Sequence, residues 1–207
     1  MKKWIVLAIV MLTLGAWFAS ASRNATPELS SSYIFDNPRP LAQFNLHDQY
    51  GNAFTNADLQ GKWTLFFIGF TSCPDVCPTT LNKLTAAYPQ LQAIDESIQV
   101  VFVSADPARD SQAKLLDYIN FFNKDFKAVT ADHSVLFPFS RDLGFSYAMV
   151  GDDDNYQVDH SASYVLVSPA GIKTAVFKTQ IQPGEAPQIK NKDLIEDFKQ
   201  IVSSSPS

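Results

Sequence analysis

The fold is decided by residues 63–78, which read Trp63-Thr-Leu-Phe-Phe-Ile-Gly-Phe70 and then Thr71-Ser-Cys-Pro-Asp-Val-Cys-Pro78. The first half is a continuous apolar run, which is typical of a β-strand covered on both faces. The second half carries both cysteines of the chain and leads into apolar residues at helical spacing over residues 79–93. A buried strand that ends in a cysteine loop and continues into a helix predicts a functional site at the carboxyl end of that strand.

Outward from this segment, strands and helices alternate. Residues 98–104 form a second apolar run, so the helix between the two runs completes a βαβ unit. Strands are also expected at residues 164–167 and 174–177, a hairpin near residues 44–54, and helices at residues 111–122, 135–143 and 193–202. This order predicts an α/β, thioredoxin-like fold with a central mixed sheet flanked by helices and an N-terminal hairpin.

The N-terminus has the pattern of an export signal. Two lysines precede an apolar run over residues 4–19, and Ala19-Ser-Ala21 supplies the small residues of a cleavage site. The run would form about 24 Å of helix, somewhat less than a membrane core of about 30 Å. Residues 1–22 are therefore expected to be either a cleaved signal peptide or a membrane-targeting signal-anchor, which places the remainder on the periplasmic face of the inner membrane.

Composition and charge limit the class of protein, the number of domains and the role of the cysteines. The 207-residue chain has a net charge of −5, which argues against nucleic-acid binding. Residues 23–40 are rich in Ser, Asn and Pro and predict a linker or a covering arm, followed by one domain over residues 41–203. Two cysteines are too few for a multi-disulfide scaffold, so Cys73 and Cys77 are expected to act as one pair.

The cysteine pair can serve more than one purpose. Cys77 stands where a helix N-cap is expected, with Pro78 at the first helical position, so the helix dipole would favour a thiolate at Cys77. Three residues separate the sulfurs, which can turn towards one point or oxidise to a disulfide. A purely structural disulfide is the alternative, but so short a loop restrains little of the unfolded chain.

A third ligand would have to come from three histidines. His47, in the expected hairpin, and His133, near an expected helix start, are interpreted as surface or capping residues. His160 directly precedes the strand at residues 164–167, and that loop approaches the cysteine loop in a thioredoxin-like sheet. Two sulfurs and one imidazole suit Cu(I), or Cu(II) with an added ligand, while zinc could use the same three with water.

Three motifs in this order resemble the signature of the Sco/SenC family: Phe70-Thr-Ser-Cys-Pro-Asp-Val-Cys-Pro78, Ser104-Ala-Asp-Pro-Ala-Arg-Asp110 and Val158-Asp-His160. The family consists of thioredoxin-fold copper-binding proteins tethered outside bacterial or inner mitochondrial membranes. The resemblance implies copper as the metal, with Cys73, Cys77 and His160 as its ligands. It also implies delivery to the cytochrome c oxidase subunit that carries the binuclear copper centre, with a second protein as the copper donor.

Two functions remain open on these residues. A copper chaperone passes its metal on by ligand exchange and requires no catalytic turnover, so the chain would not be an enzyme. A thiol-disulfide oxidoreductase would instead use Cys73 and Cys77 as a redox-active pair to reduce client cysteines, with His160 incidental or a proton shuttle.

Two acidic segments lie near these motifs. In residues 106–110, Asp110 is expected to cap the following helix and Arg109 to pair with a nearby carboxylate, with direct shaping of the metal loop as the alternative. Asp152, Asp153 and Asp154 are interpreted as a solvated loop, or as a docking patch for a basic partner.

Overall fold

An eight-stranded mixed sheet forms the centre of the protein in the computed structural model, which describes residues 11, 29–151, 156–180 and 188–205. The strand order is β1-β10-β9-β4-β5-β6-β2-β3. The strands span β1 Ser32–Pro40, β2 Asn45–Asp48, β3 Ala53–Thr55, β4 Thr64–Gly69, β5 Gln99–Ser104, β6 Lys127–Thr130, β9 Tyr164–Val167 and β10 Ile172–Phe177.

The centre of the sheet is parallel and its margins are antiparallel. β4, β5 and β6 pair in parallel, while β9 runs antiparallel to β4 and β2 runs antiparallel to β6. Every residue of β4 and β5 is buried, which confirms the interpretation of both apolar runs as strands covered on two faces. Successive β4 side chains alternate between two cores, with Phe67 on one face and Phe66 on the other.

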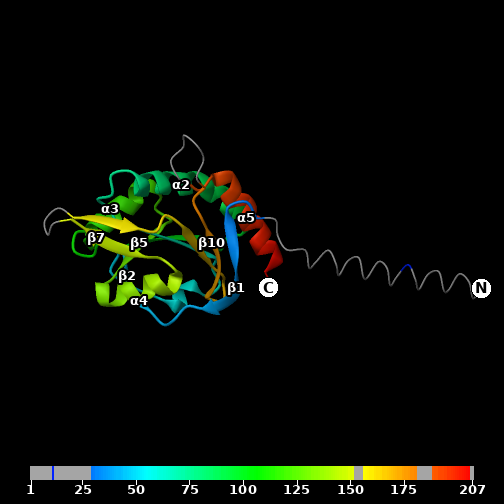
Figure 1. Ribbon diagram of the computed structural model, residues 1–207, viewed down its shortest axis with the longest axis horizontal. Coiled ribbons are helices and arrows are strands. Elements are labelled where there is room, and N and C mark those ends of the chain that lie inside the picture. Colours follow the sequence, from blue (N-terminus) through cyan, green and yellow to red (C-terminus); the bar gives the residue numbers. More distant parts are fainter. Residues whose placement is uncertain (1–10, 12–28, 152–155, 181–187, 206–207) are drawn as a thin grey trace, which may run out of the picture.

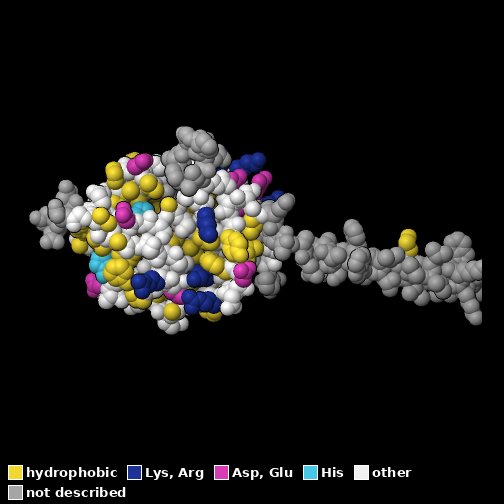
Figure 2. All heavy atoms as spheres, in the orientation of Figure 1, with side chains coloured by type: hydrophobic (Ala, Val, Ile, Leu, Met, Phe, Trp, Pro, Cys, Tyr) yellow, Lys and Arg dark blue, Asp and Glu magenta, His cyan; other side chains and the backbone are white. Residues whose placement is uncertain are grey.

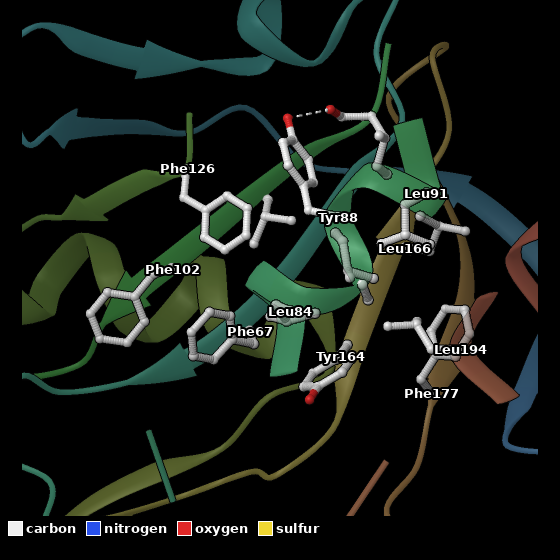
Figure 3. Close-up of a cluster of buried hydrophobic side chains, with 14 of the residues drawn as sticks. Phe67, Leu84, Tyr88, Leu91, Phe102, Phe126, Tyr164, Leu166, Phe177 and Leu194 are labelled. Carbon is white, nitrogen blue, oxygen red and sulfur yellow. Dashed lines mark hydrogen bonds between the residues drawn. The ribbon is translucent and has the colours of Figure 1, made fainter. Parts of the chain in front are cut away.

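Helices cover both faces (Figure 1). One face packs against α2 (Val76–Ile94), α3 (Gln112–Phe122) and α5 (Asn191–Ser204), and the other against α4 (His133–Leu143) and the short 3₁₀ helix η1 (Asn56–Leu59). Figure 3 shows the core beneath α2, where the rings of Phe67, Phe102 and Phe126 lie beside Leu84. The α/β, thioredoxin-like architecture expected from the sequence is confirmed.

A separate two-stranded sheet consists of β7 (Tyr147–Val150) and β8 (Gln157–His160), with Tyr147 opposite His160. Neither strand was expected from the sequence. The buried side chains of Tyr147 and Val158 anchor this hairpin on the α4 face of the main sheet. The last residue of β8 is thereby brought to the end of β4.

Residues 23–40 were expected to be a linker or a covering arm, and the linker is wrong for residues 32–40, which form β1 and pair with β10. Asp197, fully buried on α5, accepts hydrogen bonds of 2.8 Å from the backbone N–H groups of Ser30, Ser31 and Ser32. These bonds fix the start of the strand, so this arm belongs to the domain.

The expected signal segment, residues 1–22, lies outside the described residues apart from Met11, and membrane targeting stays a prediction. Among the helices that the structure describes, none combines the length and the apolar character needed to cross a membrane. On the face that Figure 2 shows, Lys and Arg side chains lie singly or in small groups, some of them beside Asp or Glu side chains.

Candidate metal centre

The cysteine loop connects β4 to α2. The helix begins at Val76 with Asp75 as its N-cap, so Cys77 is its second residue and Pro78 its third. The expectation that Cys77 is the N-cap is therefore wrong by two residues. Cys77 is buried, with 1% of its surface exposed, whereas Cys73 is partly exposed at the mouth of the loop.

Cys73, Cys77 and His160 meet at this point. Their ligand atoms, two Sγ and one imidazole nitrogen, all lie within 4.8 Å of one another. Cys77 Sγ lies 3.5 Å from His160 Nε2. Cys73 from the loop, Cys77 from the first turn of α2 and His160 from the end of β8 thus form a three-donor group that could hold a metal ion.

The histidine presents the correct nitrogen to the sulfurs. Its Nδ1 lies 3.1 Å from the carbonyl oxygen of Ser161. A carbonyl oxygen only accepts hydrogen bonds, so Nδ1 donates to Ser161, and Nε2 is the nitrogen that lies towards Cys77 Sγ and can serve as a metal ligand. A backbone carbonyl that fixes the tautomer in this way is typical of metal-ligating histidines.

The two sulfurs differ in protonation. Hydrogen bonds from the Cys77 and His160 side chains, and from the backbone N–H groups of Cys77 and Asp75, lower the pKa of Cys73 to about 3 against the opposing effect of burial. The hydrogen bond to Cys73, together with burial, raises the pKa of Cys77 well above its usual range. The thiolate therefore belongs to Cys73 and not, as expected from the helix start, to Cys77.

Gly69 is a site residue that sequence reasoning missed. A Cβ at this position would lie 2.5 Å from Cys77 Sγ and 2.9 Å from the Phe102 ring. The Cys77 sulfur thus occupies the space where a side chain on the last residue of β4 would begin. The glycine next to an apolar run was the available signal, but only the position of Cys77 shows what it is for.

Asp110 holds the cysteine loop and does not cap α3. The N-cap is Ser111, whose hydroxyl accepts the N–H of Lys114. The buried Asp110 carboxylate accepts hydrogen bonds from Thr71 N at 2.9 Å, Thr71 Oγ1 at 2.5 Å and Ser104 Oγ at 2.6 Å. It ties the residue after Phe70 to the end of β5, which supports the loop-shaping alternative for this segment.

The other histidines do not reach the centre. His47 lies exposed on β2, and His133 begins α4, where its Nδ1 lies 3.0 Å from the Tyr147 hydroxyl. The interpretation of His133 at a helix start is confirmed. The acidic loop Asp152–Asp154 lies outside the described residues.

A thioredoxin-like sheet with two cysteines at a strand end and a histidine facing them defines a thioredoxin-like protein with a candidate metal centre. Residues 36–194 match the family model described as SCO1/SenC, which covers well over half of the chain. The chain therefore belongs to the SCO1/SenC family.

Relatives and solved structures agree with this assignment. The chain is 33% identical over 203 residues to an SCO2-like protein of Rickettsia prowazekii, covering 95% of each, and 35% identical over 180 residues to the mitochondrial SCO2 homolog of Bos taurus, covering 84% of this chain and 68% of that one. The copper-bound structure of Arabidopsis thaliana ScoI superposes with a TM-score of 0.70 at 26% identity, covering 81% of this chain and all of that one. Copper-bound yeast Sco1 gives 0.67 at 27% identity, covering 81% and 90%.

Proposed function

We propose that this protein is a copper chaperone that binds copper through Cys73, Cys77 and His160 and delivers it to the binuclear copper centre of cytochrome c oxidase. The observation that carries the proposal is the convergence of the three donor atoms within 4.8 Å. Two thiolates and one neutral imidazole form a soft donor set that suits Cu(I), and Cu(II) with an added ligand. The copper-bound structures of two relatives support the choice of metal.

The position of the centre supports transfer rather than permanent storage. Cys73 is partly exposed, and its neighbours Pro74, Asp75 and Val76 are exposed as well. A client's ligands can therefore approach the metal from the side of Cys73 and replace the protein's donors one at a time. We place this exchange on the periplasmic face of the inner membrane, with a second protein as the copper donor, because the N-terminal sequence has the pattern of an export signal.

Copper titration of the full reduced chain, in competition with a chromophoric chelator, tests the proposal. One copper should bind per chain, and the disulfide form should bind none tightly because both thiolates are consumed. His160→Ala should weaken Cu(II) binding more than Cu(I) binding, since Cu(II) depends more on nitrogen donors. His47→Ala, on the exposed part of β2, is the matched control. Equal copper retention by the oxidised protein would refute the proposal.

Thiol-disulfide exchange is the second candidate, and the partial exposure of Cys73 favours it. The two functions disagree about His160. If copper transfer is the function, His160→Ala leaves the reduction of a model disulfide nearly unchanged while copper binding falls. If thiol exchange is the function, His160→Ala impairs disulfide reduction and leaves copper binding intact.

A further inference from the structure

Tyr156 is the residue directly before β8. Its carbonyl oxygen, its ring and its hydroxyl all contact the loop that follows β5. Nη1 of Arg109 donates a hydrogen bond of 2.9 Å to the Tyr156 carbonyl oxygen, and the guanidinium lies 3.7 Å from the centre of the Tyr156 ring. The Tyr156 hydroxyl donates a hydrogen bond of 2.6 Å to Asp106. Asp106 is fully buried and also accepts a hydrogen bond from Nε of Arg109. We call Asp106, Arg109 and Tyr156 the arginine clamp.

The hairpin that carries His160 depends on such contacts. β7 and β8 pair with each other and form a sheet separate from the eight-stranded one. A two-stranded hairpin is marginally stable when it stands alone. Its position is therefore set by packing and by side-chain bonds, and the arginine clamp fixes the end of β8 opposite to His160.

Phe70 connects the clamp to the other end of β8. The Arg109 guanidinium lies 5.8 Å from the centre of the Phe70 ring, and that ring packs nearly edge-on against the His160 imidazole at 6.2 Å between centres. Phe70 is buried, with 3% of its surface exposed. One arginine thus lies against both the residue directly before β8 and the ring that packs against the histidine.

The next residue of the same loop, Asp110, holds Thr71 on the cysteine side of the centre. We propose that Arg109 is a positioning residue that directs Nε2 of His160 at the two sulfurs, so that residues 106–110 align both halves of the centre. This inference rests on the proposed function, because it assigns Arg109 a role in copper binding through His160.

The test is a double-mutant cycle on copper affinity in the full chain. Arg109→Lys keeps the positive charge but loses the planar fork and the stacking on Tyr156. Loss of an outer partner of a metal ligand weakens binding by about 10- to 100-fold, and we expect about tenfold for Cu(II). In the His160→Ala background the same substitution should change affinity less than about twofold, because the residue it positions is gone. Arg39→Lys, in a surface ion pair with Asp142 at 3.0 Å, is the matched control.

Two further readouts distinguish positioning from a general loss of structure. Nitrogen coupling in the Cu(II) electron paramagnetic resonance spectrum should weaken in Arg109→Lys, and amide hydrogen exchange in β8 of the copper-free protein should become faster. Tyr156→Phe removes only the hydroxyl bond to Asp106. It should give a smaller loss of affinity, which should also vanish in the His160→Ala background.

The results that overturn the inference are separable from those that overturn the proposed function. An equal loss in both backgrounds, or wild-type affinity in Arg109→Lys, would overturn the positioning role alone. Unchanged copper affinity in His160→Ala by itself would overturn the proposed function and this inference together.

Discussion

Replacing Gly69 by alanine should displace Cys77, one of the three proposed copper ligands, without removing a polar group. The new Cβ would stand 2.5 Å from Cys77 Sγ, whereas ordinary contacts begin at 3.4 Å. The sulfur must therefore move by the difference, 0.9 Å, or the Phe102 ring and the strand must move instead. Overpacking of this kind costs about 1–3 kcal/mol of folding stability.

The displacement should weaken copper binding as well as folding. Metal-binding constellations tolerate a displacement of about 0.5 Å, so a shift of 0.9 Å should weaken Cu(I) binding by about tenfold or more. Chelator competition gives the affinity, and urea unfolding of the copper-free protein gives the stability. Gly69→Ala is expected to lower both.

Gly61→Ala provides the matched control. Gly61 has a φ of 74° and open space around it, so an alanine there costs about 1–2 kcal/mol through backbone strain and leaves the centre unchanged. The control should lose stability and keep its copper affinity. Wild-type copper affinity in Gly69→Ala would refute the argument that the glycine makes room for the sulfur.

Three further predictions follow from the polar groups of the centre. Asp110→Asn should lower the free energy of unfolding by about 2–3 kcal/mol, since buried donors lose a charged acceptor; a urea-measured loss below about 0.5 kcal/mol would contradict its role. The folded-state pKa of Cys73 is about 3, below the ordinary 9.0, so its contribution to stability is complete above pH 9 and is lost as the pH falls towards 3. Alkylation followed by mass spectrometry should accordingly modify Cys73 at a nearly constant rate from about pH 5 to 8 and spare buried Cys77; preferential labelling of Cys77 would reverse the assignment. Copper binding near pH 8 should release one proton, from Cys77, because Cys73 is already ionised. Calorimetry in buffers of different ionisation enthalpy would count it, and two protons would contradict the difference between the thiols.

The strands and the site histidine could be predicted because they follow from patterns in the sequence itself. The apolar runs that became β4 and β5 are buried on both faces, and the pattern of each run is sufficient to show it. His160 could be selected because the place of a loop in a thioredoxin-like sheet follows from strand order. The strands are recognised from a short stretch of chain, and His160 from the order of strands along it.

The features of the fold and of the centre that could not be predicted depend on partners distant in the sequence. β1 has mostly exposed side chains, and its strand pairing depends on β10 and on Asp197 of α5. The role of Asp110 depends on Thr71, 39 residues earlier, and that contact outweighed the local preference for an N-cap. The ionisation of the cysteines was assigned to the wrong residue because burial of Cys77 is a tertiary property that the helix start alone does not reveal.

The same ionisation bears on the choice between metal transfer and thiol reduction. A thiolate with a pKa of about 3 is a weaker nucleophile than one that titrates near neutral pH, and its low pKa stabilises the reduced pair relative to the disulfide. A cysteine pair whose reduced form is stabilised is a weak reductant of a client disulfide. It does, however, keep both sulfurs available as metal donors under oxidising conditions, with His160 Nε2 beside them. The hydrogen bonds that define the centre therefore favour copper transfer over client reduction.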